Sequence, residues 1–265
     1  MSIATKISGL RAMMAFTNRW QLIVNRLLFR CTEDLYVMND TRFIVDYAGG
    51  DATGTRECIV SDMYRQYLPV IKLTGDITLL DIGANGGGFP LLFKIEGYEF
   101  KKIVCVEMNP NTFNRLRYNI FSNFNCTCEC INVALTNSVG TIDLLLGAGS
   151  TSDSIYQGEQ PVNGKKIKYK IPTVTLDTLF EAQFVSVVDI LKMDIEGAEY
   201  DVLLHKGCDN LSMVRYLVME IHDNPKIQKG LLIDKINSLG FTELLADSKK
   251  YTDVYCFANK LHVNG

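Results

Sequence analysis

From residue 75 onward, short apolar runs alternate with segments of helical periodicity, and this alternation limits the folds open to the chain. The expected strands are ITLLDIG (77–83), KKIVCVEM (101–108), CTCECINVAL (126–135), VVDILKMDI (187–195), MVRYLVMEIH (213–222), FTELLA (241–246) and TDVYCFANK (252–260). Helical segments such as PNTFNRLRYNIFSN separate most of them. Repeated strand–helix–strand units require a mostly parallel sheet covered on both faces. We therefore expect a doubly wound α/β fold, without a linker or an internal repeat.

Two runs in the middle of the chain break this alternation. GTIDLLLGAG (140–149) and KKIKYKIPTVTL (165–176) alternate or run apolar without a helical period, which predicts an inserted β-hairpin. The glycine-, serine- and aspartate-rich stretch GAGSTSDS lies at its tip. Ser152, Asp153 and Tyr156 offer groups that could recognise substrate hydroxyls, although an exposed turn explains them equally well.

Composition and charge exclude several classes of protein. The chain has 265 residues, of which 47% are apolar and 22% charged, as in a soluble globular protein. A net charge of -3 argues against nucleic acid as the main partner. Eight cysteines without framework spacing indicate reduced thiols in a cytoplasmic protein. Cys126, Cys128 and Cys130 alternate on one expected strand, which favours a buried strand face over a metal site.

The first 30 residues form a segment of unusual composition. They contain five basic and no acidic residues, and apolar residues recur there at near-helical spacing. Charges interrupt every apolar run, so neither a secretory signal nor a membrane-spanning helix of about 20 residues is expected. Two interpretations stay open: a helical arm packed on the domain or a partner subunit, and a basic helix on an anionic membrane surface.

The stretch LLDIGANGGGF predicts a tight turn that brings the backbone close to a ligand. A nicotinamide-binding loop has glycine at all three positions of G-x-G-x-x-G, whereas Asn85 occupies the middle position here. Asp81, at the strand end, would repel a pyrophosphate and attract a cationic cofactor; unit charges 4 Å apart interact by about 4 kcal/mol at a dielectric of 20. Glu107 ends the next strand and can accept both hydroxyls of a ribose. These residues favour a positively charged nucleoside.

Two pairs of motifs resemble a known family. DIGANGGGF with VEMNP is similar to the first motifs of class I methyltransferases, and LKMDIEGAEYDVLLHKG followed by LVMEIH resembles the signature of the FkbM family. The resemblance runs from about Leu79 to the end of the chain. It implies a Rossmann-like sheet of seven strands, S-adenosylmethionine as methyl donor, and methylation of a hydroxyl, commonly on a sugar of a glycan, glycolipid or natural product. We divide the chain into an N-terminal helical extension, residues 1–55, and a methyltransferase domain, residues 56–265.

The resemblance also implies which residues bind the cofactor. Asp81, Gly83, Asn85 and Gly87 would contact its methionine part, and Glu107 its ribose. Asn132 and Ala134 would border the adenine. Glu57, upstream of the first strand, is a further candidate for the methionine amino group.

Catalytic residues are expected at the ends of the fourth and fifth strands. Transfer of a methyl group to a sugar hydroxyl needs a base or a metal near the acceptor oxygen. We expect His222 to be the general base, with Asp194 or Glu196 orienting it or gripping the substrate; Glu220 points to the same side of its strand as His222. A Mg or Mn ion held by these oxygens and the imidazole is an alternative. Asp194, Glu196 and Glu199 could each be explained by the dipole of the helix that follows them, but three such acids beside Glu220 and His222 favour a functional cluster.

Two other functions are weighed against this one. A nicotinamide-dependent oxidoreductase shares the fold class, but Asn85 and Asp81 disfavour it. A catalytically silent protein that binds the cofactor is the second alternative.

Overall fold

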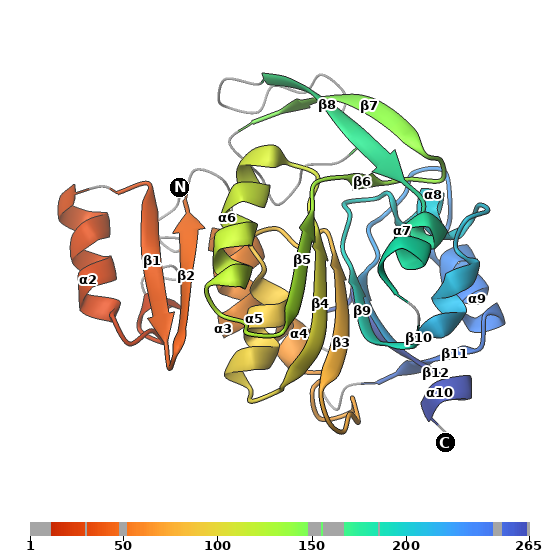
Figure 1. Ribbon diagram of the computed structural model, residues 1–265, viewed down its shortest axis with the longest axis horizontal. Helices are drawn as coiled ribbons and strands as arrows, with labels where there is room; N and C mark the ends of the chain where they lie inside the picture. Colours follow the sequence, from red (N-terminus) through yellow and green to blue (C-terminus); the bar gives the residue numbers. More distant parts are fainter. Residues whose placement is uncertain are drawn as a thin grey trace.

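The computed structural model describes residues 12–29, 31–47, 52–147, 155, 167–184, 186–245 and 251–263. Seven strands form one sheet in the order β11-β12-β10-β9-β3-β4-β5 (Figure 1). Their bounds are β3 (Ile77–Ile82), β4 (Phe100–Val106), β5 (Thr127–Ile131), β9 (Val188–Met193), β10 (Val214–Glu220), β11 (Phe241–Leu244) and β12 (Val254–Asn259). Neighbouring strands are parallel except for β12, which is antiparallel to both β10 and β11. The doubly wound, mostly parallel sheet of seven strands is thus confirmed.

Helices cover both faces of this sheet. They are α3 (Cys58–Val60), α4 (Asp62–Arg65), α5 (Gly88–Ile95), α6 (Pro110–Phe121), α7 (Leu176–Gln183), α8 (Glu199–Leu203), α9 (Lys229–Ser238) and α10 (Lys260–Val263). Successive residues of a strand pack into opposite clusters: Leu79 contributes to the cluster that contains α5 and α6, and Leu80 to the cluster that contains α7, α8 and α9. Both side chains are fully buried, as expected of a strand with a core on either face.

The strand order reverses between β3 and β9, the two central strands. From β3 the chain moves outward to β4 and β5, and from β9 it moves the other way to β10. Ligands of such open sheets bind at the carboxyl ends of the strands at this switch point. The fold therefore predicts a ligand site at the loops that follow β3, β4, β9 and β10.

The inserted hairpin is confirmed and has a third strand. β7 (Gly140–Leu146) and β8 (Ile167–Val174) pair antiparallel, and the short β6 (Ala134–Leu135) pairs parallel with β8. Figure 1 shows this small sheet lying across the end of the main sheet. Ser152, Asp153 and Tyr156 lie outside the described residues, so their expected role stays a prediction.

The N-terminal extension is only partly helical. It contains α2 (Arg19–Val24) and a π-helical turn (Asn25–Phe29), but β1 (Glu33–Met38) and β2 (Thr41–Asp46) form an antiparallel hairpin. The expectation of a helical extension is therefore wrong for residues 33–46. There, buried residues alternate with more exposed ones, and Tyr36, Phe43 and Phe16 pack their rings together. Asn39, with a φ of 55°, makes the turn between the strands.

Side-chain amides close the outer edge of β2. Asn119 on α6 accepts a hydrogen bond from the backbone N–H of Ile44 at 2.7 Å and donates one to its carbonyl at 3.1 Å. One helical turn later, Asn123 makes the same pair of bonds with Arg42, at 2.8 and 2.6 Å. Because Arg42 and Ile44 are two residues apart, the spacing of the strand matches the i, i+4 spacing of the helix. The hairpin is thereby joined to the methyltransferase domain.

The outer edge of β1 is closed in a similar way. Asn18 donates to the carbonyl of Leu35 at 2.7 Å and accepts from the N–H of Val37 at 3.1 Å. The backbone N–H of Thr17 reaches the carbonyl of Val37 at 2.7 Å. Backbone groups that a two-stranded sheet usually leaves to water are thus satisfied by the protein.

The cysteines are as expected from the sequence. All eight cysteines are free thiols. Cys126, Cys128 and Cys130 pack together against the apolar cluster beneath α5 and α6, as expected of one face of a strand. In the described part of the chain, no helix has the length and apolar character needed to span a membrane.

Candidate active site

A cavity of about 230 Å³ lies at the switch point of the sheet. Its wall combines the loop after β3, the ends of β4, β9 and β10, the segment around α3 and α4, and Ile155 from the insertion. Polar lining residues are Asn85, Glu107, Tyr64, Lys192, Asp194, Glu196 and Glu220. One concave site with convergent polar groups is the usual form of a small-molecule site.

The loop after β3 has a conformation that its sequence requires. Gly83 has a φ of 73°, and a Cβ at this position would lie 1.7 Å from the carbonyl oxygen of Asp194. Any side chain would therefore force β3 and β9 apart. Asn85 has a φ of 49°, a conformation that asparagine tolerates better than most residues. Its side-chain oxygen accepts hydrogen bonds from the N–H of Gly86 at 2.8 Å and from the hydroxyl of Thr55 at 3.2 Å.

Glu107 lines the cavity at the end of β4. Its Oε2 accepts a hydrogen bond from the N–H of Asn85 at 3.0 Å, and its Oε1 accepts one from the N–H of Asn109 at 2.7 Å. Asn132 supports the same turn, because its amide donates to the carbonyls of Glu107 and Met108 at 2.8 and 2.9 Å. The carboxylate is thus held in a fixed plane at the wall of the cavity.

Asp81 does not line the cavity, although it lies near the end of β3, just before the glycine loop. It is fully buried, and the ammonium of Lys192 lies 3.3 Å from its Oδ1. Neither oxygen of Asp81 has a hydrogen bond of good geometry. Burial raises the pKa of Asp81, and the charge of Lys192 opposes that shift. Lys192 already neutralises the carboxylate of Asp81. The expected direct contact between Asp81 and a cofactor stays a prediction.

Lys192 links three parts of the site from beneath. Its ammonium donates to the carbonyl of Gly83 at 2.7 Å and lies 3.6 Å from Oδ2 of Asp194. Burial favours the neutral amine, but the carboxylates of Asp81 and Asp194 outweigh burial and raise the pKa of Lys192. A charged lysine therefore holds the glycine loop and both acids in one arrangement.

Asp194 presents its two oxygens to different neighbours. The hydroxyl of Tyr64 donates to Oδ2 at 3.3 Å, on the same oxygen that faces Lys192. Burial, together with the charge of Asp194, raises the pKa of Tyr64 well above its usual value, so the hydroxyl keeps its proton. Oδ1 faces the other way and lies 4.0 Å from Nε2 of His222.

His222 is oriented by a buried carboxylate. Oε1 of Glu199 lies 3.0 Å from Nδ1 of the imidazole and also accepts the N–H of Ile195 at 3.1 Å. Glu199 is fully buried, and the hydroxyl of Tyr200 fixes the backbone by donating to the carbonyl of His222 at 2.8 Å. The expected partners of His222 were Asp194 or Glu196. The orienting partner is instead Glu199, which the sequence alone explained as a helix-dipole residue.

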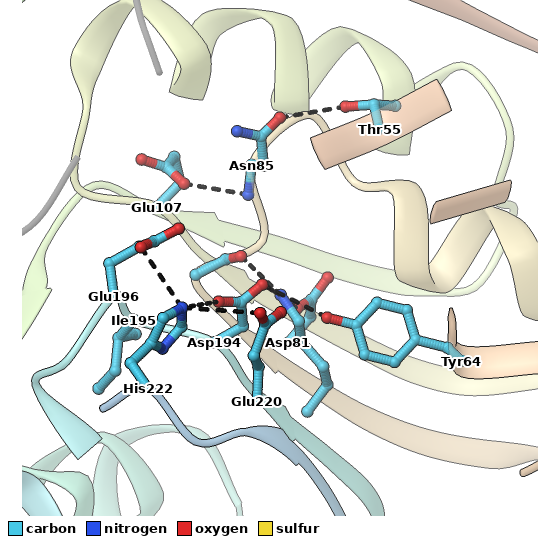
Figure 2. A network of polar contacts seen from close by, with 12 residues as sticks. Thr55, Tyr64, Asp81, Asn85, Glu107, Asp194, Ile195, Glu196, Glu220 and His222 are labelled. Atoms are coloured by element: carbon cyan, nitrogen blue, oxygen red, sulfur yellow. Dashed lines mark hydrogen bonds and ion pairs between the residues drawn. The ribbon is translucent and has the colours of Figure 1, made fainter. Parts of the chain in front are cut away.

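Nε2 of His222 faces a ring of carboxylates (Figure 2). Oε2 of Glu196 lies 3.4 Å from Nε2, Oε1 of Glu220 lies 3.7 Å from it, and Oδ1 of Asp194 lies 4.0 Å from it. Burial lowers the pKa of His222, but the hydrogen bond and charge of Glu199 and the charges of the ring raise it overall, to about 9. The imidazole is therefore protonated at neutral pH.

Glu196 combines backbone strain with a shifted pKa. Its φ is 54°, in the left-handed region that side chains rarely adopt, and Gly197 follows at 98°. Burial raises the pKa of Glu196 to about 7, with His222 acting against the shift and Asp194 adding to it. Residues held in such conformations cluster at functional sites. A carboxylate that titrates near neutrality and faces the cavity is suited to proton transfer.

The residues expected from the sequence divide into two groups. Those that line the cavity are Gly83, Asn85, Glu107, Ala134, Asp194 and Glu196. Those that do not are Asp81, Gly87, Asn132 and His222, although His222 contacts lining residues. A Cβ on Gly87 would lie 3.1 Å from side chains of α6, so this glycine serves the packing of the turn. Glu57 is also outside the lining, and it pairs with Arg56 at 3.2 Å.

Sequence reasoning missed Lys192, Tyr64 and the role of Glu199. Lys192 offered a signal, because it is a charged residue inside an apolar strand, two positions before Asp194 and hence on the same side. Tyr64 offered none, since its segment precedes the first motif and reaches Asp194 only through the tertiary fold.

A divalent cation fits this site poorly. Asp194, Glu220 and His222 each offer a ligand atom, and these atoms lie within 4.8 Å of one another. The site already holds two cations against these acids, the ammonium of Lys192 and the protonated imidazole. A Mg or Mn ion would have to displace the imidazole proton.

Comparison with known proteins identifies the family. A family model described as the methyltransferase FkbM domain matches residues 81–245. The chain belongs to the FkbM methyltransferase family. The matched region begins at Asp81 and includes the glycine loop, Glu107 and the whole cluster around His222. The protein is accordingly a methyltransferase, which sets aside the oxidoreductase as an alternative.

One relative of this FkbM methyltransferase and two solved structures illustrate the similarity. The hexuronic acid methyltransferase AglP of Haloferax volcanii is 31% identical over 183 residues, 65% of this chain and 68% of its own. A crystal structure of methyltransferase FkbM from Methylobacillus flagellatus matches 72% of this chain and 45% of that one, with 15% identity and a TM-score of 0.48. TrmK of M. capricolum, solved with S-adenosyl-homocysteine, matches 74% of this chain and 66% of that one, with 8% identity and a TM-score of 0.39.

Proposed function

We propose that this enzyme transfers a methyl group from S-adenosylmethionine to a hydroxyl of a sugar. The observation that carries the proposal is that one cavity joins Glu107, positioned for a ribose, to the cluster around His222, suited to proton transfer. The relative from Haloferax volcanii, named for a hexuronic acid, supports a carbohydrate as acceptor.

The residues around the glycine loop fit the donor. Glu107 would accept the two ribose hydroxyls, because backbone N–H groups already fix both of its oxygens. Gly83 and Asn85 would border the methionine part, and the apolar lining at Val133 and Ala134 would cover the adenine. When bound, the sulfonium donor supplies an electrophilic methyl group. The excess of carboxylates at the end of the cavity near Asp194 favours a cation there.

The geometry supports an exchange of the roles expected for Glu196 and His222. His222 holds its proton at neutral pH, so it is poorly suited to accept another. Glu196 has a pKa of about 7 and lines the cavity, so we assign it as the acceptor of the hydroxyl proton. As the O–H bond gives up its proton to Glu196, the new O–C bond forms and the S–C bond breaks. His222 would hold Glu196 in place through the ion pair at 3.4 Å.

The charge of the cluster favours a hydroxyl over a carboxylate as the methylated group. An acceptor carboxylate next to Glu196 would also face Asp194 and Glu220. Each pair of like charges 4 Å apart costs about 4 kcal/mol at a dielectric of 20. The carboxylates of the site outnumber its two cations, the imidazolium of His222 and the ammonium of Lys192, so the repulsion exceeds the attraction. A neutral hydroxyl avoids this repulsion.

Mass spectrometry can test the proposal directly. The enzyme would be incubated with S-adenosylmethionine and a panel of neutral sugars, uronic acids and their nucleotide-linked forms, and products would be screened for a gain of one methyl group. We expect a product that survives mild base, as a methyl ether does and a methyl ester does not. Calorimetry with S-adenosylhomocysteine separates the two halves of the proposal. A base-labile product would contradict the hydroxyl acceptor, and absence of cofactor binding would contradict the donor.

A further inference from the structure

One side of the N-terminal extension carries an exposed apolar surface. It consists of Trp20, Val24, Leu27, Leu28 and Phe29, whose exposed fractions are 66, 42, 64, 73 and 69%. Trp20 and Val24 lie four residues apart on α2, and Leu27, Leu28 and Phe29 follow on the π-helical turn. We call these five residues the outer face. Contiguous apolar patches of this kind mark interaction sites in soluble proteins.

The extension does not need the outer face for its own core. Leu22, on the opposite side of α2, is fully buried and packs with Phe16, Tyr36 and Phe43. Figure 1 shows α2 on the side of β1 that faces away from the main sheet. In the part of the chain that the structure describes, the outer face is left to solvent. It is therefore a second apolar side on a helix whose inner side is already packed.

Charge is segregated in the same segment. The first 32 residues carry five basic and no acidic residues, whereas the remaining 233 carry 22 basic and 30 acidic residues. Arg19 and Arg26 belong to the same helical segment as the outer face, whereas the chain after residue 32 is net negative. Attraction to an anionic surface is the electrostatic consequence.

We propose that the outer face binds the surface of an anionic lipid bilayer. Apolar side chains with a tryptophan, in a sequence segment whose charged residues are all basic, are the composition of helices that lie in the membrane interface. A second copy of the chain fits less well, because a two-fold contact would bring the two positive segments against each other. A phosphate-bearing polymer would satisfy the charge but leave Leu27, Leu28 and Phe29 uncovered.

The chain contains a built-in probe of this surface. Trp20 is its single tryptophan and belongs to the outer face. Intrinsic tryptophan fluorescence therefore reports on this site alone. Titration with phosphatidylcholine vesicles that contain phosphatidylglycerol should shift the emission to shorter wavelength, and brominated lipids should quench it. Vesicles of phosphatidylcholine alone should give a much smaller change, and added salt should weaken binding to the anionic vesicles.

Substitutions separate insertion of the outer face from general stickiness. In the double variant Leu28→Gln/Phe29→Gln, partitioning onto anionic vesicles should weaken by about tenfold or more. Matched controls are Leu231→Gln and Leu261→Gln, which remove leucines that are 57 and 73% exposed elsewhere on the protein. The controls should bind vesicles like the unaltered chain. Since all four side chains are exposed, every variant should keep its binding of S-adenosylhomocysteine, so this test does not depend on the sugar acceptor.

Several results would overturn the proposal. Equal binding to neutral and anionic vesicles would contradict the preference for an anionic bilayer. Equal weakening in the control variants would show that the outer face does not insert. A concentration-dependent dimer, seen by light scattering and lost in Leu28→Gln/Phe29→Gln, would assign the surface to a second copy. Fluorescence that responds to an acidic protein or to RNA and not to vesicles would assign it to that partner instead.

Discussion

The side-chain amide of Asn119 donates a hydrogen bond of 2.8 Å to the carbonyl of Gly86. Because the same fully buried side chain also pairs with both backbone groups of Ile44, it joins the glycine loop to the N-terminal hairpin. The extension is therefore linked physically to the cofactor site. This link can be tested because a second asparagine, Asn123, contacts the hairpin but makes no hydrogen bond to Gly86.

Replacing Asn119 with alanine should weaken cofactor binding as well as stability. The carbonyl of Gly86 and the groups of Ile44 would lose their partner, at a cost of about 2–3 kcal/mol in the free energy of unfolding. Asn123→Ala is the matched control, because Asn123 pairs with Arg42 and has no bond to Gly86. Calorimetry with S-adenosylhomocysteine should show weaker binding for Asn119→Ala only. Equal binding by both variants would mean that the glycine loop is held without the hairpin.

Replacing Lys192 with methionine should destabilise the protein strongly. Asp81 would be left buried without a counter-charge, and removal of one partner of a buried ion pair costs about 3–5 kcal/mol. Adding Asp81→Asn removes the stranded charge and should restore part of that loss. Urea unfolding of the two single variants and the double variant measures the coupling. If the two effects simply add, the pair contributes no interaction energy.

Glu199→Gln should lower kcat with little change in the affinity for cofactor. Glutamine cannot supply the negative charge that orients His222 and stabilises its protonated imidazole through Nδ1. Loss of such a supporting carboxylate typically lowers activity by about 10–100-fold. The NMR titration of His222 should move from about 9 toward its ordinary value. Asp201→Asn, on the same helix but paired with His205 at 3.6 Å, should leave both readouts unchanged. An unshifted titration in Glu199→Gln would contradict the orienting role.

Activity should depend on pH through two groups. The pKa of Glu196 is about 7, so kcat/KM should fall as pH drops below that value and the carboxylate gains its proton. The pKa of His222 is about 9, so kcat/KM should fall again above that pH, where the ion pair with Glu196 is lost. The two values describe a coupled pair. A pH profile of Glu196→Gln should lack the acidic limb, and persistence of that limb would assign it to another group.

Glu196→Gly should separate stability from activity. Glycine adopts a φ of 54° freely, so relief of strain should stabilise the fold by about 0.5–1 kcal/mol. The same substitution removes the group assigned to accept the proton, and methyl transfer should fall by at least about a hundredfold. Thermal unfolding and the methylation assay measure the two effects on one sample. A variant that is both stable and active would exclude Glu196 as the proton acceptor.

Strand-end positions were predictable from the sequence, and the pairing of charges beneath them was not. Gly83, Glu107 and Asp194 lie where the order of strands and loops places them. The direction of Asp81 depends on Lys192 on the adjacent strand, a pairing that only the register of β3 against β9 reveals. Glu199 begins a helix, so the sequence alone can explain it by the helix dipole. Only the structure shows that its carboxylate contacts His222, which lies 23 residues later in the chain.

The hairpin of the extension was missed for a different reason. The basic, apolar stretch before it has a strong helical period, and the alternation around Tyr36 and Phe43 is short. Its stability comes from ring packing and from asparagines that are distant in sequence. A two-stranded hairpin is marginal by itself, so its presence depends on these tertiary contacts.

The asparagines along the hairpin also bear on solubility. A strand whose outer N–H and C=O groups are open can recruit a strand from a neighbouring molecule, and such growth leads to fibrils. Asn18 occupies these groups on one strand, and Asn119 and Asn123 occupy them on the other. These amides thereby protect the hairpin from edge-to-edge aggregation by filling its open hydrogen-bonding groups.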